Sequence, residues 1–216
     1  MSAAARDIVL VDGGGTNIGS VRYALQRLGL DAELSADAAR IRRASHVILP
    51  GVGAAGPGMA KLRAANLAPV LQGLTQPLLG VCLGMQLLFE RSSELGDTAG
   101  LGLLAGHVTR LDVGASGLRV PHIGWNEVRP VRPAPLTAGL PPQGAAFYHV
   151  HSYAVRPTDP GDVVATTTYG ETFPTVVAHG SVMGTQFHPE KSSAHGLQLL
   201  AAFCALVSDA PRPVRV

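Results

Sequence analysis

The chain has 216 residues, enough to bury the core of one domain without help from disulfides or metals. Hydrophobic residues make up 46% of it and charged residues 15%, which excludes an intrinsically disordered chain. Seventeen Lys and Arg against fifteen Asp and Glu leave a net charge of +2, too balanced for binding nucleic acid through charge. The two cysteines, Cys82 and Cys204, are too few for a disulfide framework, so we expect free thiols in a cytoplasmic protein. No apolar stretch is long enough for a membrane span.

The first half of the sequence alternates short apolar segments with amphipathic ones. Strands are predicted at residues 8–11, 46–49 and 77–81, each a short apolar run. A helix is predicted from residue 18 to its stop signal at Gly29, and another is predicted to include residues 85–89. Strands that alternate with helices indicate right-handed crossovers. The sequence therefore predicts an α/β fold with a mostly parallel central sheet flanked by helices.

The second half has a different pattern. From about Gly106 to Phe187 the apolar segments are short, often β-branched, and separated by Pro and Gly turns, with a hairpin predicted around Gly180-Ser181. A last helix is predicted at residues 196–207. We therefore expect a single domain over residues 1–216, in which an antiparallel strand extension follows the parallel part and the tail 208–216 is frayed.

A glycine-flanked cysteine, in the segment Gly80–Gly84, stands between the third predicted strand and a helix. Glycines two residues on either side of Cys82 let the chain bend sharply, as in the turns that carry nucleophiles in hydrolases. The helix that follows directs its free N–H groups at the sulfur, which favours the thiolate, and the Leu83 amide is placed to donate to an oxyanion. The alternative is a buried structural cysteine, the interpretation that fits Cys204.

A second motif, His188-Pro189-Glu190, lies near the other end of the chain. Strand periodicity sends residues two apart to the same side, so both side chains are predicted to face the nucleophile. A carboxylate bound to one imidazole nitrogen leaves the other free to accept the thiol proton. Alone, His188 is more often a structural histidine. Together with Cys82 it favours a Cys–His–Glu triad.

These two motifs resemble a known family. GVCLGMQLL and QFHPEKS are similar to the nucleophile and His/Glu segments of class I, triad-type glutamine amidotransferases, and the likeness runs over residues 8–207. The resemblance implies that Cys82 attacks the side-chain amide of L-glutamine and forms a γ-glutamyl thioester. It also implies that His188 shuttles protons while Glu190 holds it, and that Gln86 helps to bind the glutamine. No cofactor or metal is implied.

Four further segments bear on the acceptor of the ammonia. VDGGGTNIGSV, LPGVGAA, PHIGWNEV and FYHVHSY resemble the glutaminase subunits of imidazole glycerol phosphate synthases, which act in histidine biosynthesis. The resemblance implies a separate partner, a (β/α)₈ cyclase, that uses the ammonia to form imidazole glycerol phosphate and aminoimidazole carboxamide ribotide. Because the sequence ends soon after the last predicted helix, we expect no fused synthetase domain, and this favours a separate partner. The alternatives are a glutaminase subunit for another synthase, such as pyridoxal phosphate synthase, and a catalytically dead regulatory scaffold. The complete triad argues against the scaffold.

The segment Pro50–Gly53 is a candidate second element of the oxyanion hole. By resemblance, Val52 and Gly53 complete the hole with Leu83, Gly51 adjoins the bound glutamine, and the orientation of a peptide here depends on the partner's ligand. Glycines on both sides of Val52 let a peptide rotate at modest steric cost. The residues alone favour an ordinary strand-to-helix turn.

The segment His151-Ser152-Tyr153 is placed beside the glutamine by the resemblance. His149 and His151 could instead be metal ligands, but no carboxylate or thiol stands at ligand spacing nearby, so we expect no metal.

Four residues are placed at the partner interface by the resemblance. They are Asn17, Trp125, Asn126 and Lys191. Trp125 could equally be a core residue, and Lys191 could be a solvated charge.

Overall fold

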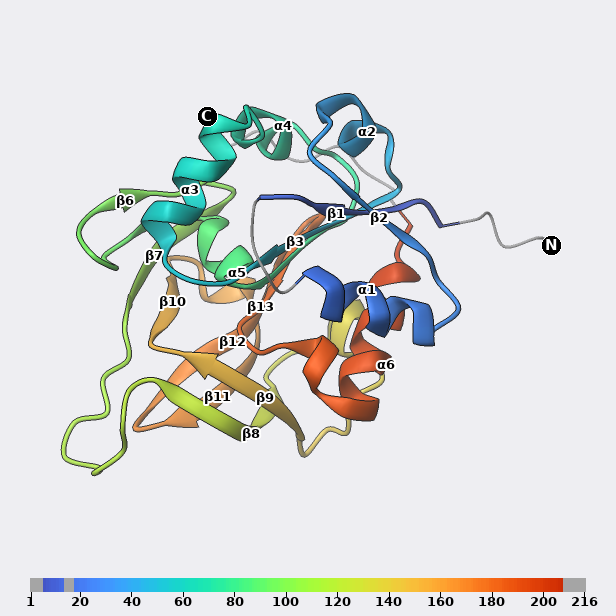
Figure 1. Cartoon of the computed structure of the whole chain (residues 1–216). Helices are drawn as coiled ribbons and strands as arrows, with labels where there is room; N and C mark the ends of the chain where they lie inside the picture. Colours follow the sequence, from blue (N-terminus) through green and yellow to red (C-terminus); the bar gives the residue numbers. More distant parts are fainter. Residues whose placement is uncertain (1–5, 14–17, 208–216) are drawn as a thin grey trace.

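The computed structural model describes residues 6–13 and 18–207, and the frayed tail expected at 208–216 lies outside this range. A nine-stranded mixed sheet forms its centre, in the order β2-β1-β3-β4-β13-β12-β11-β8-β9 (Figure 1). The parallel part consists of β2 (Ala32–Ser35), β1 (Ile8–Val11), β3 (His46–Gly51), β4 (Leu78–Cys82) and β13 (Val182–Thr185). The antiparallel part consists of β12 (Glu171–His179), β11 (Val163–Tyr169), β8 (His122–Pro130) and β9 (Ala145–His151). The predicted α/β fold with an antiparallel extension is confirmed.

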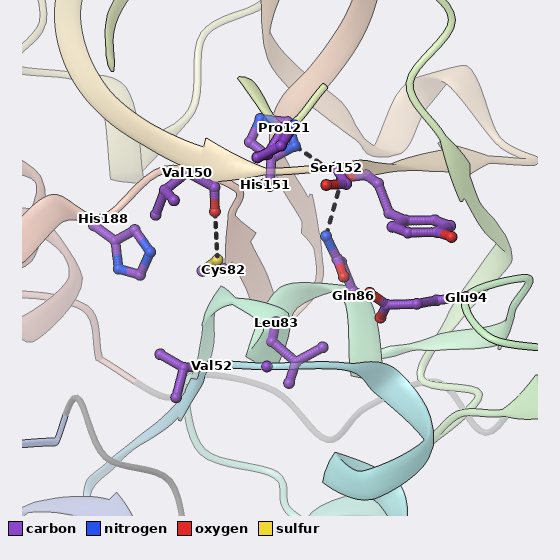
Figure 2. Close-up of a pocket in the computed structure, with 12 residues that line it drawn as sticks. Val52, Cys82, Leu83, Gln86, Glu94, Pro121, Val150, His151, Ser152 and His188 are labelled. Atoms are coloured by element: carbon purple, nitrogen blue, oxygen red, sulfur yellow. Dashed lines mark hydrogen bonds between the residues drawn. The ribbon is translucent and has the colours of Figure 1, made fainter. Parts of the chain in front are cut away.

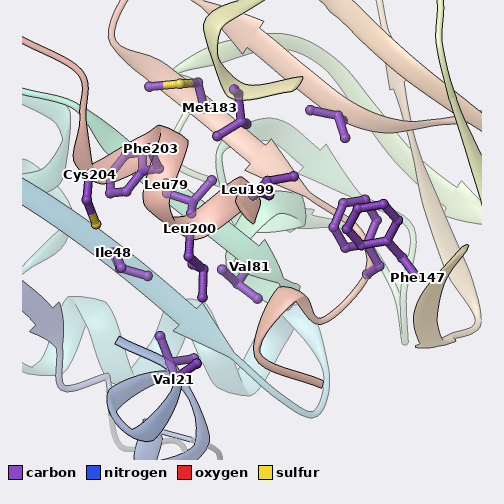
Figure 3. Packing of buried hydrophobic residues seen from close by; sticks show 14 of the residues in the cluster. Val21, Ile48, Leu79, Val81, Phe147, Met183, Leu199, Leu200, Phe203 and Cys204 are labelled. Carbon is purple, nitrogen blue, oxygen red and sulfur yellow. The ribbon is translucent and has the colours of Figure 1, made fainter. Parts of the chain in front are cut away.

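Helices cover both faces of the parallel part (Figure 1). One face packs against α1 (Ile18–Arg27) and α6 (Ser193–Cys204); the other packs against α2 (Ala38–Arg43), α3 (Ala55–Ala64), α4 (Ala68–Gln72) and α5 (Leu83–Leu87). Side chains alternate between the two faces of the sheet along each strand, so a strand contributes to the hydrophobic cluster on each face. In β1, Ile8 and Leu10 belong to the cluster under α1 and α6 (the first cluster), while Val9 and Val11 belong to the cluster on the other face. Figure 3 shows the first cluster, with Leu199 and Leu200 of α6 over the sheet. Strands covered on both faces are apolar throughout, which explains the short apolar runs in the sequence.

A second, four-stranded sheet lies beside this core. It contains β10 (Tyr153–Pro157), β7 (Leu104–Arg110), β5 (Phe89–Ser92) and β6 (Thr98–Ala99), in that order. Short 3₁₀ helices occupy Pro135–Thr137, Pro160–Asp162 and Pro189–Lys191. None of the helices in the described part of the chain is both long and apolar enough to cross a membrane.

The sequence-based helix over residues 85–89 is wrong at its end. The helix α5 stops at Leu87, and Phe89 begins β5. The Leu87 carbonyl accepts a hydrogen bond from the Leu101 amide at 2.8 Å, and the Leu88 carbonyl accepts one from Leu103 at the same distance. These bonds come from a distant segment and replace the intrahelical bonds that the local apolar spacing predicts.

The parallel strands bring three segments to one edge of the sheet. Gly51 at the end of β3 lies in register with Cys82 at the end of β4, and Thr185 at the end of β13 pairs with Val81. The residues that follow these three strands therefore meet at one place, the carboxyl edge where α/β folds bind ligands.

Candidate active site

The backbone at Cys82 is strained. It is the last residue of β4 and the residue before α5, with φ +54° and ψ −111°. A side chain at positive φ is costly and is retained where the surrounding structure imposes it, most often at functional sites. The residue is 7% exposed, and its sulfur faces a cavity at the start of α5 (Figure 2).

Close backbone packing imposes this conformation. A Cβ atom on Gly84 would lie 1.9 Å from the carbonyl oxygen of Leu49 in β3. A Cβ on Gly51 would lie 2.6 Å from the amide nitrogen of Gly84. The first turn of α5 thus lies directly against β3, and only glycine leaves room for it. Gly51, predicted beside the glutamine, is used in this packing and does not line the cavity that Cys82 faces.

His188 and Glu190 form a buried pair. The Nδ1 atom of His188 lies 2.7 Å from Oε1 of Glu190, and the two side chains are 3% and 0% exposed. The predicted reason for their proximity is wrong, because β13 ends at Thr185 and Glu190 belongs to the 3₁₀ helix Pro189–Lys191. The tight turn, not strand periodicity, folds the carboxylate back onto the imidazole. The Ser192 hydroxyl donates to the His188 carbonyl at 2.6 Å, which holds the turn.

The charge state of His188 follows from its two partners. Burial alone would lower the pKa of the imidazole, but hydrogen bonds to Cys82 and Glu190 outweigh burial and raise the pKa of His188 to about 10. The ring is therefore an imidazolium at neutral pH, placed beside the sulfur (Figure 2). An adjacent cation favours a thiolate over a thiol.

A cavity of about 370 Å³ opens in front of Cys82. It is lined by Val52, Gly53, Cys82, Leu83, Gln86, Glu94, Pro121, Val150, His151, Ser152, Tyr153 and His188. The structure thus brings together all the predicted oxyanion residues and four of the five predicted glutamine contacts. Figure 2 shows side chains from β4, α5, β9 and the segment that follows β3 converging on it.

The predicted glutamine contacts are joined to one another by hydrogen bonds. Gln86 Nε2 donates to the Tyr153 carbonyl at 3.0 Å. His151 Nδ1 lies 2.8 Å from the same carbonyl, and its Nε2 lies 3.3 Å from Nδ1 of the buried His122. Burial lowers the pKa of His151 to about 3, so its ring is neutral. One wall of the cavity is therefore a rigid, uncharged network.

Four residues of the site were missed by the sequence analysis, and one of them is Pro121, just before β8. Glu94 supplies the one acidic side chain of the cavity lining, and its Oε2 accepts from the Ala55 amide at 2.8 Å. The Val150 carbonyl lies 3.9 Å from the Cys82 sulfur, and Gln186 Nε2 also lies 3.9 Å from it. Pro121, Val150 and Gln186 belong to the segments PHIGWNEV, FYHVHSY and QFHPEKS, in which only other residues were assigned a role, whereas no quoted segment contains Glu94.

The described residues contain no group of three or more His, Cys, Asp and Glu side chains arranged to hold a metal ion. His149, the alternative ligand, is turned to protein partners, with Nδ1 3.1 Å from the Phe147 carbonyl and Nε2 3.1 Å from the Thr175 hydroxyl.

Three of the four predicted interface residues, Trp125, Asn126 and Lys191, lie outside the cavity lining. Trp125 is 55% exposed and makes an edge contact with Tyr148, which excludes the core alternative. Asn126 donates to the Thr168 carbonyl at 3.0 Å, and Lys191 is exposed. Asn17 lies outside the described residues.

Comparison with known proteins agrees with this geometry. Residues 9–206 match the family model "Glutamine amidotransferase class-I". The chain is 51% identical over 197 residues to the imidazole glycerol phosphate synthase subunit HisH of Xanthomonas axonopodis pv. citri, covering 91% of this chain and 96% of that protein. It is 50% identical, with the same coverage, to the subunit of that name in Xylella fastidiosa.

Solved structures of low identity share the fold. PurLQS from Thermotoga maritima superposes with a TM-score of 0.69 at 18% identity, covering 93% of this chain and 98% of that one. The glutaminase domain of Trypanosoma brucei CTPS, solved with bound acivicin, gives 0.61 at 18% identity, covering 95% and 96%. Because the family model matches nearly the whole described chain, the protein belongs to the class I glutamine amidotransferase family and is an enzyme of that family.

Proposed function

We propose that this protein hydrolyses L-glutamine to glutamate and ammonia through a thioester on Cys82 and passes the ammonia to a cyclase subunit. The observation that carries the proposal is that Cys82 and His188 line one cavity, with Glu190 buried against His188, within a chain of the amidotransferase family. The match to residues 9–206 supports a single amidotransferase domain.

The reaction divides into two steps at the sulfur. The Cys82 thiolate attacks the side-chain carbonyl carbon of glutamine, and the His188 imidazolium donates its proton to the leaving nitrogen, so that ammonia departs and a γ-glutamyl thioester remains. Neutral His188 then takes a proton from water, which attacks the thioester carbon. The sulfur leaves as a thiolate and glutamate is released. Glu190 holds the imidazole and stabilises its charge throughout.

Both tetrahedral intermediates place negative charge on the former carbonyl oxygen. The Leu83 amide at the start of α5 is one donor to this oxyanion, and the adjacent segment Val52–Gly53 supplies the second. Removing one such donor typically costs about 10²–10³-fold in rate.

Different residues of the cavity lining are available to bind different polar groups of glutamine. Gln86, His151, Ser152 and Tyr153 lie on one wall, where amide and backbone groups bind the polar atoms of the substrate. Glu94 is the acidic group of the lining, and we assign it to the α-ammonium group.

The acceptor of the ammonia is inferred from the relatives. Proteins that are 50–51% identical over 91% of the chain are subunits of imidazole glycerol phosphate synthase, which supports a (β/α)₈ cyclase as partner and histidine biosynthesis as the pathway. Trp125 and Ile123, which are 55% and 60% exposed on β8, offer an apolar docking surface. Pro121, just before β8, lines the cavity, so a partner bound there would adjoin the site. Asn126 and Lys191 extend this interface. Two free cysteines fit a cytoplasmic enzyme.

The deciding experiment is Cys82→Ala in the complex reconstituted with the cyclase. Synthesis of imidazole glycerol phosphate from glutamine should vanish, while synthesis from added ammonia should persist. Cys204→Ala is the matched control, since that cysteine is fully buried in α6, and both activities should survive it. Retention of glutamine-dependent synthesis in Cys82→Ala would refute the assignment. Stimulation of glutamine turnover by a different synthase would refute the acceptor.

A further inference from the structure

A line of buried amides runs beneath the nucleophile. Gln86 Nε2 donates to the Tyr153 carbonyl and to Oε1 of Gln186, both at 3.0 Å. Gln186 is 0% exposed, and its Nε2 lies 3.9 Å from the sulfur of Cys82. The two glutamines are 100 residues apart in the sequence, so their contact is a tertiary one.

The orientation of the Gln186 amide is fixed by its neighbours. The carbonyl of Tyr153 can only accept, so Gln86 must turn its NH₂ group toward it. The same NH₂ group also donates to Gln186, so the amide oxygen of Gln186 must face it and accept the hydrogen bond. The NH₂ group of Gln186 is then directed at the sulfur. Reversing this amide would place two NH₂ groups against each other in a buried space, which is costly.

The backbone of Gln186 is also held. Its amide donates to the Thr175 carbonyl of β12 at 2.9 Å, and it lies two residues before His188 on the same segment. The segment that carries the imidazole therefore also carries the amide, and both groups interact with the sulfur.

The groups around the sulfur act in opposite directions. The Val150 carbonyl, 3.9 Å away, can only accept and so favours a protonated thiol. The N–H of Gln186 can only donate and becomes stronger when the sulfur is charged. We propose that Gln186 is a catalytic residue that donates a hydrogen bond to the Cys82 thiolate and, held by Gln86, stabilises the attacking form of the nucleophile. The inference rests on the proposed function, since it assigns Cys82 as that nucleophile.

The test measures ionisation of the thiol directly, by the pH dependence of its alkylation by iodoacetamide. The full chain carries Cys204→Ala so that Cys82 is the one reactive cysteine. Gln186→Met removes the amide at similar size, and Gln186→Glu keeps the acceptor for Gln86 while removing the donor. Gln76→Met is the matched control: Gln76 is a buried glutamine whose Nε2 donates to the Ile41 carbonyl at 3.0 Å, away from the cavity.

We expect both Gln186 variants to alkylate about 10- to 100-fold more slowly than the parent at pH 7 and at the same rate at pH 10. Gln186→Glu should show the larger effect, because its charge repels the thiolate. The Gln76 variant should follow the parent profile. Unchanged rates at pH 7, or an equal loss at both pH values, would reduce Gln186 to a packing residue and overturn the inference. A shifted alkylation profile in a protein whose parent form does not turn over glutamine even with the cyclase and its nucleotide substrate would instead refute the proposed function and leave the role of Gln186 intact.

Discussion

Nδ1 of His188 lies 2.7 Å from Oε1 of Glu190, and both side chains are almost completely removed from solvent. A buried carboxylate this close stabilises the imidazolium and fixes the nitrogen that faces it. The other ring nitrogen is thereby reserved for the sulfur of Cys82. The pair thus determines both the charge and the orientation of the His188 imidazole.

Glu190→Gln tests this pair, since it keeps the shape and removes the charge. Because Glu190 raises the pKa of His188, the variant should lose the imidazolium at lower pH, and the alkaline limb of glutamine turnover should move down from about 10. We expect kcat to fall on the order of 10²–10⁴-fold. Glu33→Gln, at an exposed carboxylate on β2, is the control and should retain activity. An unaltered pH profile in Glu190→Gln would contradict the assigned role.

Glu94 is predicted to determine recognition of the α-ammonium group. In Glu94→Gln the amide oxygen can still accept from the Ala55 amide, so the loop should keep its fold. We expect KM for glutamine to rise about tenfold or more, with kcat changed little, because the contact is made equally in the ground and transition states.

A second substrate makes the Glu94 test specific. Glutaramate is glutamine without its α-amino group, so the parent enzyme should strongly prefer glutamine over it. The Glu94→Gln variant should lose most of that preference. An equal loss of kcat/KM for both substrates would show that Glu94 serves the loop and not the ammonium group.

Acid stability is predicted from three buried histidines beside the cavity. Burial lowers the pKa values of His122, His149 and His151 to about 4, 2 and 3, whereas the ordinary value is 6.5. Below pH 6.5 the unfolded chain takes up protons that the folded one does not, so stability falls as the pH decreases. Each histidine contributes at most about 1.4 kcal/mol per pH unit.

Urea unfolding between pH 7.5 and 5 measures this slope. His149→Leu should be less stable at pH 7.5, because it loses two hydrogen bonds, but its stability should fall less steeply toward pH 5. Phe173→Leu, a neighbouring buried position whose ring lies 5.3 Å from that of His151, should lose stability equally at both pH values. Parallel slopes in all three proteins would disprove the assignment.

The features of this site that depend on local backbone geometry could be predicted from the sequence. The glycines around Cys82 predicted a strained turn before a helix, and the structure shows that Gly84 is needed to let α5 lie against β3. The HPE motif predicted the imidazole–carboxylate pair, although a 3₁₀ turn and not a strand brings them together. The His188–Glu190 contact joins residues that are close in the sequence, and a glycine such as Gly84 by itself indicates that the backbone packs closely at that position.

The rest depends on contacts between distant segments. Gln86 and Gln186 are 100 residues apart and meet only because β4 and β13 are neighbours in the sheet. Phe89 leaves the helical pattern because a segment near Leu101 pairs with the chain before it. Neither event alters the local hydrophobic spacing on which the predictions were based.

The rotation of a peptide at Val52 is the remaining prediction. Rotating the Gly51–Val52 peptide to direct the Val52 N–H at the oxyanion changes φ of Val52 by about 180°. Val52 is not among the residues at positive φ in this structure, so the rotation would carry it there. For a β-branched residue this costs on the order of 1–2 kcal/mol. The isolated subunit should therefore hydrolyse glutamine poorly, and the cyclase with its nucleotide substrate should raise the rate.

Val52→Gly should remove that cost, so the isolated variant should turn over glutamine about tenfold faster than the parent, and stimulation by the partner should shrink by the same factor. Gly53→Ala is the matched variant. Gly53 already has φ +91° with open space around its missing Cβ, so alanine there strains the resting backbone without touching the Val52 N–H. Faster turnover in Gly53→Ala and not in Val52→Gly would mean that the Gly53 amide is the donor, because rotation of its own peptide would bring φ from +91° to about −90°, where alanine is relaxed.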